Sequence, residues 1–175
     1  GQTEYANGRP VDAFETVYDL ASITKIAATT LAVMRLYERD SIVLDAPVSR
    51  YWPEVNADLG ALTIRQLLLH RSGLPAYLPF YEGGLKGKRL NPSVLSKRRS
   101  EHFDIPVAAG LYLHHNYPNE IWRKIALLKP KSEATPEYSD INMMIVAHII
   151  ERMTGRSLEA YVGEHFYRPM GMNMT

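Results

Sequence analysis

From Ser22 to about Arg39, hydrophobic positions recur at three- and four-residue steps, the spacing of one face of an α-helix. The repeating residues are Ile23, Ile26, Ala27, Thr30, Leu31, Met34 and Tyr37. Further helices are predicted at 118–128 and 140–154, and shorter ones at 63–69 and 157–167. The chain is therefore expected to be predominantly helical with little sheet.

Residues at the ends of these segments support the predicted helices. Thr63 and Gln66 have the spacing of a capping box, in which each side chain bonds the backbone of the other residue. Gly155 follows the long segment and suits a left-handed C-terminal cap. Ser157 is then expected to cap the last helix, which ends before Pro169.

Three segments lack the helical repeat. Residues 1–20 contain short strand-like pieces, such as 16–18, that are interrupted by Asn7-Gly8 and Pro10. They predict a weak hairpin or an extended N-terminal segment. Residues 76–117 are rich in Gly, Pro and basic side chains, and we interpret them as a mobile or ligand-facing insertion with room for one short helix. The stretch 130–136 is bracketed by prolines and predicted to be extended.

Composition excludes several classes of protein. The 175 residues suffice for one domain, and 20 basic against 19 acidic residues give a net charge of +1, so no global attraction to nucleic acid or to an anionic membrane is expected. No apolar run reaches the roughly 20 residues of a membrane span, and no signal peptide is recognisable. Without cysteine, the chain has no disulfide, thiol nucleophile or cysteine zinc site.

The six histidines do not predict a metal site. His114 and His115 are adjacent and should point apart on a regular element, and no carboxylate or histidine stands at ligand spacing around them. His148 lies among apolar residues of a predicted helix and is interpreted as a core or boundary residue. No cofactor is implied.

Candidate chemistry begins at Ser22 and Lys25. Residues three apart on a helix share one face, so the hydroxyl and the amine can meet. A serine nucleophile needs a neighbouring base, and an amine serves only when neutral. Desolvation and the positive end of the helix dipole both favour the neutral amine there. The Ser22 N–H at the helix start is a candidate oxyanion-hole donor.

The tetrapeptide alone is weak evidence. Ten Ser and seven Lys among 175 residues give about 0.4 occurrences of Ser-x-x-Lys by chance. The alternative interpretation of Ser22 is a helix N-cap followed by a solvated Lys25.

Three longer blocks change this balance. The first is 18–25 (YDLASITK), followed by a helix and by 41–48 (SIVLDAPV). The second is 62–75 (LTIRQLLLHRSGLP), and the third is 137–140 (EYSD), followed by a helix and 168–172 (RPMGM). In this order the blocks resemble the class C β-lactamase, D,D-peptidase and esterase family of penicillin-binding-like proteins, over roughly two thirds of the chain.

The resemblance implies an α+β fold of the β-lactamase/transpeptidase type, of which this chain supplies mainly the helical part with short N-terminal strands. It implies Ser22 as the nucleophile, Lys25 as its partner, and Tyr138 as a residue that shares proton transfer. The family's Tyr-x-Asn motif holds Asp140 at its third position. An ionised Asp only accepts hydrogen bonds, and pairing with Lys25 would raise the pKa of the amine and leave Tyr138 as the main base. Asp140 as the N-cap of its helix, with chemistry altered or lost, is the alternative.

The resemblance also implies what this stretch lacks. The family's third motif, on a downstream strand that supplies the second oxyanion donor, has no counterpart before Thr175, so residues 1–175 are expected to form a single incomplete domain. Losing one such donor costs about 2.7–4 kcal/mol, so little turnover is expected of the chain by itself.

The expected substrate is a small-molecule or peptidoglycan-derived acyl compound, and the expected location is exported, periplasmic or membrane-anchored through another part. The variant motif and the insertion resemble domains fused behind a family 3 glycoside hydrolase, which makes another domain a possible partner. The rival hypothesis is a catalytically degenerate binding or scaffolding domain.

Overall fold

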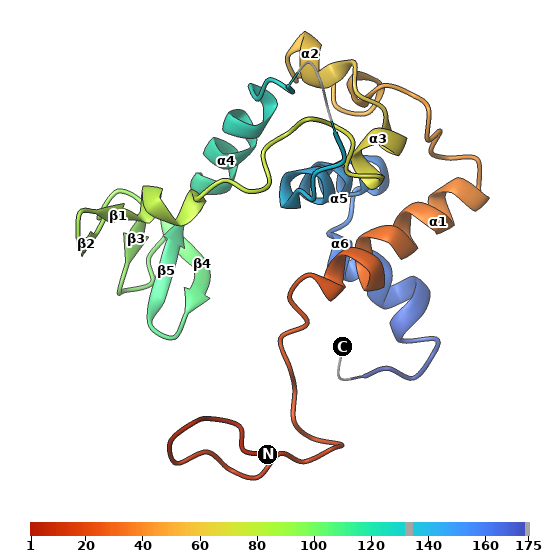
Figure 1. The fold of residues 1–175 in the computed structure, drawn as a ribbon. Coiled ribbons are helices and arrows are strands. Elements are labelled where there is room, and N and C mark those ends of the chain that lie inside the picture. The colour runs from red at the N-terminus through yellow and green to blue at the C-terminus, as the bar shows by residue number, and fades with distance from the viewer. Residues whose placement is uncertain (132–134, 174–175) are drawn as a thin grey trace.

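The computed structural model describes residues 1–131 and 135–173, and its centre is helix α5 (Asp140–Thr154). The Ser139 hydroxyl caps the N-terminus by accepting from the Asn142 N–H, and Gly155 ends the helix with φ of 66°. Buried Ile145, Ile149 and their apolar neighbours pack against α3, α6 and the helix that carries Lys25 (Figure 1). The predicted helix and its glycine cap are both confirmed.

The remaining predicted helices are present close to their expected limits. They are α1 (Leu31–Glu38), α3 (Ile64–Leu68), α4 (Tyr117–Ala126) and α6 (Leu158–Val162), and one further short helix, α2 (Ala57–Gly60), was not predicted. The capping box of α3 forms as the sequence predicts, and Ser157 caps α6. Short 3-10 helices occupy Val48–Arg50 and Phe80–Gly84.

Two helices contain π-helical turns, at Lys25–Thr30 before α1 and at Gly163–Tyr167 after α6. In the first, the Thr30 hydroxyl donates to the Lys25 carbonyl over 2.8 Å. The Tyr167 hydroxyl donates to the Ala27 carbonyl over 2.7 Å and joins the two helices. The first helix is thereby fixed at the turn that follows Ser22.

Residues 76–117 are more ordered than the sequence predicts. They contain two small antiparallel sheets, one of β1 (Leu85–Lys86) and β2 (Arg89–Leu90), the other with the order β3-β5-β4. The strands of the second sheet are β3 (Leu95–Ser96), β4 (Phe103–Ala108) and β5 (Leu111–His114). Both strands of the first sheet, β1 and β2, have only two residues, and β4 contains register shifts and a proline. The sequence of these strands therefore shows no alternation of apolar and polar residues.

The expected N-terminal strands do not form. Residues 1–20 contain only an isolated bridge between Gln2 and Pro10, and 16–18 have no strand partner within the described residues. Figure 1 shows this segment extending away from the helices. The bridge, with the Thr3 N–H donating to the Arg9 carbonyl over 2.9 Å, is the predicted weak hairpin; an extended stretch follows it, and the strand at 16–18 is wrong. Residues 132–134 of the predicted extended stretch lie outside the described residues.

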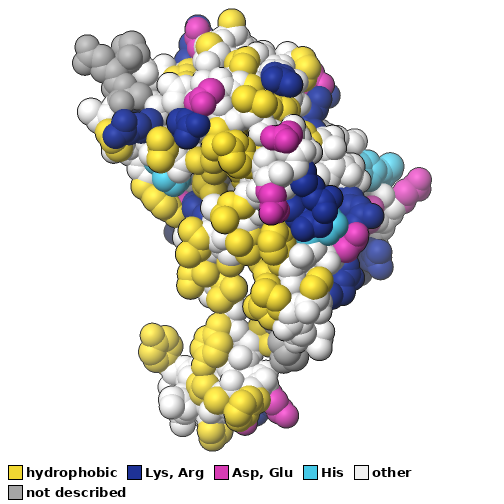
Figure 2. Space-filling model, turned by 90° about the vertical axis from the view of Figure 1, so that its right-hand side faces the viewer, with side chains coloured by type: hydrophobic (Ala, Val, Ile, Leu, Met, Phe, Trp, Pro, Cys, Tyr) yellow, Lys and Arg dark blue, Asp and Glu magenta, His cyan; other side chains and the backbone are white. Residues whose placement is uncertain are grey.

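The first helix buries the face opposite to its most visible apolar repeat. Ala32, Val33 and Leu36 belong to the core, whereas the exposed side chains at helical spacing are Ile23, Ile26, Met34 and Tyr37. Figure 2 shows hydrophobic side chains exposed on this side of the molecule. Among the described residues, no helix is long and apolar enough to cross a membrane.

Candidate active site

Ser22 and Lys25 meet at the start of the first helix. The Lys25 Nζ donates to the Ser22 Oγ over 2.9 Å, as the i, i+3 spacing predicts. The preceding residue, Ala21, has φ of 43°, a left-handed conformation uncommon for alanine, which turns the chain sharply into the helix. Within the described residues the Ser22 N–H has no hydrogen-bond acceptor, as an oxyanion donor requires.

Asp140 forms an ion pair with Lys25. The carboxylate Oδ1 lies 2.6 Å from Nζ, and the lysine side chain is 17% exposed while that of Asp140 is 48% exposed. Asp140 is the first residue of α5, and its N–H donates to the Ala76 carbonyl over 2.7 Å. The N-cap of α5 is Ser139, so Asp140 does not have the capping role that was the alternative, and its carboxylate faces the amine.

Tyr138 completes the group from the other side. Its ring centroid lies 5.0 Å from the Lys25 Nζ, and the ring stacks on His70 with centroids 4.8 Å apart. More than half of the tyrosine is exposed to solvent. The four residues expected from the sequence, Ser22, Lys25, Tyr138 and Asp140, are thus brought to one place by two segments more than a hundred residues apart.

A buried polar network fixes the turn that carries Tyr138. His70 Nδ1 accepts from the Ser139 N–H over 3.0 Å, and the Ser139 hydroxyl donates to the Pro75 carbonyl over 2.6 Å. The Ser72 hydroxyl donates to the side-chain amide oxygen (Oδ1) of Asn142 over 2.6 Å, and both residues are buried. His70 has φ of 54°. The sequence analysis assigned His70, Ser72 and Asn142 no role in the site. The feature that could have indicated this network is a polar residue, Asn142, within an otherwise apolar helix.

The charges shift two pKa values in opposite directions. Partial burial works to lower the pKa of Lys25, but Asp140 and then Tyr138 outweigh it, and the net pKa is raised. The neighbouring Lys25 amine and then the Ser22 hydroxyl lower the pKa of Tyr138. In this state Lys25 is an ammonium, and the group best suited to accept the Ser22 proton is the Tyr138 oxygen.

His70 stays neutral near pH 7. Its burial, and then the nearby Lys25 charge, lower the pKa of this imidazole. Because Nδ1 accepts the Ser139 N–H, the ring proton of the neutral form is on Nε2. His70 therefore presents a neutral stacking surface to Tyr138 and adds no positive charge to the site.

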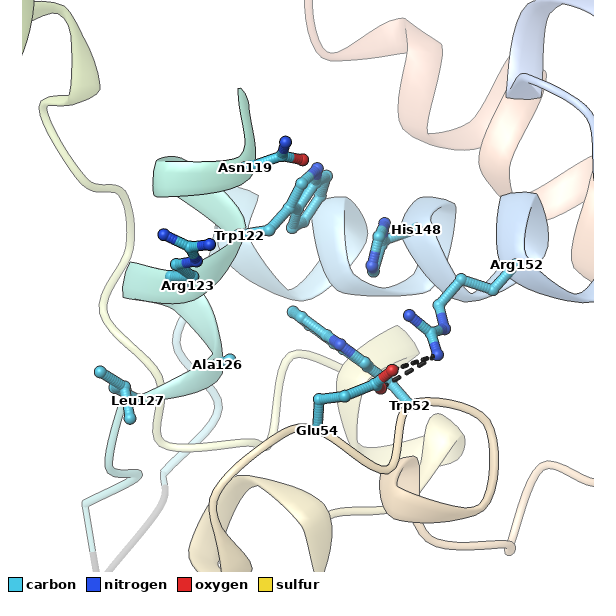
Figure 3. A pocket seen from close by; sticks show the side chains of 9 residues that line it. All are labelled: Trp52, Glu54, Asn119, Trp122, Arg123, Ala126, Leu127, His148 and Arg152. Atoms are coloured by element: carbon cyan, nitrogen blue, oxygen red, sulfur yellow. Dashed lines mark hydrogen bonds and ion pairs between the residues drawn. The ribbon is translucent and has the colours of Figure 1, made fainter. Parts of the chain in front are cut away.

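A separate cavity of about 500 Å³ lies beside the C-terminal half of α5, which contributes His148 and Arg152 to its lining (Figure 3). Trp122 stacks on His148 with ring centroids 4.1 Å apart, and Trp52 meets both rings edge-on. Arg152 makes a two-pronged ion pair with Glu54 at its rim, with distances of 2.9 and 3.0 Å. His148 is thus an aromatic packing residue at the boundary, as the sequence predicts, and the cavity contains no serine.

Three histidines of the insertion lie together, contrary to the sequence-based prediction. The rings of His114 and His115 have centroids only 4.7 Å apart, and His102 is close to both. Adjacent residues point apart only within a regular strand, and β5 ends at His114, so His115 already lies in the following turn. These residues belong to the small sheet and none of them contacts Ser22.

The fold and the helical scaffold define the chain as the helical part of a β-lactamase/transpeptidase-like protein. A D-stereospecific amidohydrolase from Streptomyces superposes on 88% of this chain and 42% of its own, with a TM-score of 0.59 and 24% identity, which shows the fold. The model of the family described as Beta-lactamase matches residues 1–175, and the chain belongs to this family.

Relatives of the chain carry the names of a peptidase, an amidase and an esterase. It is 29% identical over 167 residues to an Escherichia coli K12 protein provisionally named D-alanyl-D-alanine carboxypeptidase, covering 91% of this chain and 33% of that protein. It is 31% identical over 180 residues to the esterase EstB of Burkholderia gladioli, covering 98% and 41%. The chain thus spans about a third to two fifths of these relatives.

Proposed function

We propose that this chain carries the nucleophile and proton-transfer groups of a serine acyl-enzyme hydrolase. The observation that carries the proposal is the convergence of Ser22, Lys25, Tyr138 and Asp140, with Nζ 2.9 Å from Oγ and 2.6 Å from the carboxylate. A nucleophile, a cation beside it and a phenol of lowered pKa are the parts that acyl transfer requires.

In the proposed first step, the Ser22 Oγ attacks an ester, amide or lactam carbonyl. Its proton passes to the Tyr138 oxygen, whose anionic form the Lys25 ammonium stabilises. The Ser22 N–H donates to the developing oxyanion. When the tetrahedral intermediate collapses, Tyr138 returns the proton to the leaving nitrogen or oxygen, and an acyl-serine ester remains.

In the second step, water attacks the acyl-serine ester and passes a proton to Tyr138. Collapse of this intermediate releases the carboxylic acid and returns the proton to Ser22. The site is open to water on the Tyr138 side, where more than half of that side chain is exposed. Throughout, Lys25 works as a fixed positive charge rather than as the base.

For the substrate we favour peptidoglycan-derived peptides or related acyl compounds. The support is the named peptidase and esterase activities of the relatives, which share acyl transfer to water. A cell-wall substrate implies a protein exported to the cell envelope, and a further domain of the same polypeptide fits the longer relatives.

The rival proposal is a degenerate domain that binds an acyl compound without turning it over. The specific observation in its favour is the ion pair of Lys25 with Asp140, which stabilises the ammonium and removes the amine as a base. On this view Ser22 is unreactive because no group near it accepts its proton efficiently.

A covalent probe separates the two proposals. The protein is incubated with a fluorophosphonate or a fluorescent β-lactam, and the adduct is located by mass spectrometry. The serine-hydrolase proposal expects one adduct on Ser22 that Ser22→Ala abolishes, with Ser41→Ala, an exposed serine, as the matched control. Absence of any adduct on Ser22, with Ser22→Ala behaving like the parent, supports the degenerate domain.

A further inference from the structure

The second chemically unusual group is the set of three histidines at the end of the β3-β5-β4 sheet. His102 precedes β4, His114 ends β5 and His115 follows it. One ring nitrogen from each residue lies within 4.8 Å of those of the other two. Imidazole nitrogens that converge from three residues are the ligand set that Zn²⁺ and related divalent ions prefer.

The backbone under these residues is tied by hydrogen bonds. The His115 N–H donates to the His102 carbonyl over 2.9 Å, and the His114 N–H donates to the Val94 carbonyl over 2.9 Å. His114 is paired with Phe103 across β4 and β5, and their rings meet edge-on. The three side chains therefore start from one connected scaffold, which reduces the ordering that metal binding requires.

Hydrogen bonds made by the His115 and His114 rings determine which ring nitrogen has a lone pair available to bind a metal ion. His115 Nδ1 lies 3.1 Å from the Glu101 carbonyl oxygen, and because a carbonyl only accepts, Nδ1 carries the proton and Nε2 keeps its lone pair. A ring oriented by a backbone carbonyl in this way is typical of metal-binding histidines. His114 Nδ1 accepts the Asn116 N–H over 3.2 Å, so binding through its Nε2 moves the ring proton and gives up that bond.

We infer that His102, His114 and His115 form a binding site for a divalent transition-metal ion, with Zn²⁺ as the ion that fits best. Zn–N bonds of about 2.0–2.1 Å in tetrahedral geometry place the nitrogens roughly 3.3 Å apart, a modest contraction for side chains that are partly exposed. Three neutral imidazoles leave a fourth position for water. The ion would join the residue before β4 to the residue after β5 and close this end of the hairpin.

The test is metal binding by the full chain with Zn²⁺ alone, followed by calorimetry, and with Co²⁺, followed by its visible absorption. We expect one equivalent of either ion. Since loss of an outer-shell partner already weakens metal sites by about 10–100-fold, His102→Gln, His114→Gln and His115→Gln should each weaken binding at least tenfold. His165→Gln, which removes a histidine outside the cluster, is the matched control and should bind like the parent.

A measurement on the unaltered protein keeps the inference testable if a variant misfolds. Zn²⁺ should shift the imidazole nuclear magnetic resonances of three of the six histidines, those at 102, 114 and 115. Absence of stoichiometric binding, equal binding by the three variants and the parent, or shifts at other histidines instead would each overturn the site.

Discussion

The Lys25 ammonium lies between two oxygens, 2.6 Å from the Asp140 carboxylate and 2.9 Å from the Ser22 hydroxyl. The amine therefore has a charged partner before any substrate arrives. The Asp140 charge also raises the pKa of Tyr138, the proposed proton acceptor, so the reactivity of Ser22 is expected to depend on a residue at the start of another helix. Changing Asp140 is the most direct way to change the chemistry of Ser22.

Asp140→Asn should make Ser22 more reactive. Removing the carboxylate removes a negative charge that raises the pKa of Tyr138, the proposed base, and leaves the Lys25 ammonium to stabilise the Tyr138 anion. One pKa unit corresponds to a factor of about ten, so we expect the labelling rate below pH 8 to rise by up to tenfold and its pH profile to move to lower pH. Stopped-flow labelling with a fluorophosphonate measures both.

The same substitution has a small cost in stability, because an acidic residue in the first turn of a helix contributes about 0.3–1 kcal/mol. Glu151→Gln, which removes a carboxylate from the same helix away from Ser22, is the control for net charge. A labelling rate for Asp140→Asn at or below that of the parent, with the fold intact, would contradict the role given to the ion pair.

Tyr138→Phe should slow acylation of Ser22 without unfolding the protein. The phenyl ring can keep its stacking on His70, while the oxygen proposed to accept the Ser22 proton is lost. General acid–base groups contribute about 10²–10⁴ in rate, and we expect a loss in this range for the fluorophosphonate reaction. Tyr77→Phe, another exposed tyrosine, is the matched control. Equal labelling of Tyr138→Phe and the parent would remove Tyr138 from the proton pathway.

How much of this site follows from the sequence depends on the distance between its parts. The contact of Ser22 with Lys25 follows from helix geometry alone, since the residues are three apart. The meeting with Tyr138 and Asp140 spans more than a hundred residues and was expected only through the family resemblance. The supporting bonds among His70, Ser72 and Asn142 were not expected, because local patterns do not say which buried polar groups will pair.

The fold shows the same division. Helix α5 was predictable from its apolar content and its Gly155 cap, both local properties. The sheets within 76–117 were missed because strands such as β1 and β2 are too short to show a two-residue repeat. Which face of the first helix is buried was not decided by its own pattern either, since Ala32 and Leu36 reach the core and Met34 does not.

Ser72→Ala should destabilise the turn beneath the site. The Ser72 hydroxyl donates to the buried side-chain Oδ1 of Asn142, and removal of the hydroxyl leaves that oxygen unsatisfied. Such a loss costs about 1–3 kcal/mol of unfolding free energy. Urea unfolding followed by circular dichroism measures it, with exposed Ser41→Ala expected to change stability by less than about 0.5 kcal/mol. A loss no larger than that of the control would show that the bond is not important for stability.

Two isoleucines should respond very differently to truncation. Ile145 is fully buried in α5, and Ile145→Ala should cost about 2–5 kcal/mol of unfolding free energy. Ile26 lies 66% exposed on the apolar face of the first helix, and Ile26→Ala should change stability by no more than about 0.5 kcal/mol in the same chain. A large loss for Ile26→Ala would mean that this face is covered in solution.

Acidification should destabilise the aromatic cluster around His148. Burial between Trp52 and Trp122, and then the Arg152 charge, lower the pKa of His148, while Glu151 and Glu54 oppose the shift. Below the ordinary histidine pKa of about 6.5, the unfolded chain binds a proton that the folded chain still refuses. The contribution of neutral His148 to the free energy of unfolding is therefore complete above that pH, and it declines as the pH falls toward the lowered pKa of the folded state. His148→Gln loses the stacking at every pH and has no proton linkage at this position. The unfolding temperature of the parent should therefore fall more between pH 8 and 5.5 than that of the variant. Parallel curves for the two proteins would show that protonation of His148 is not coupled to folding.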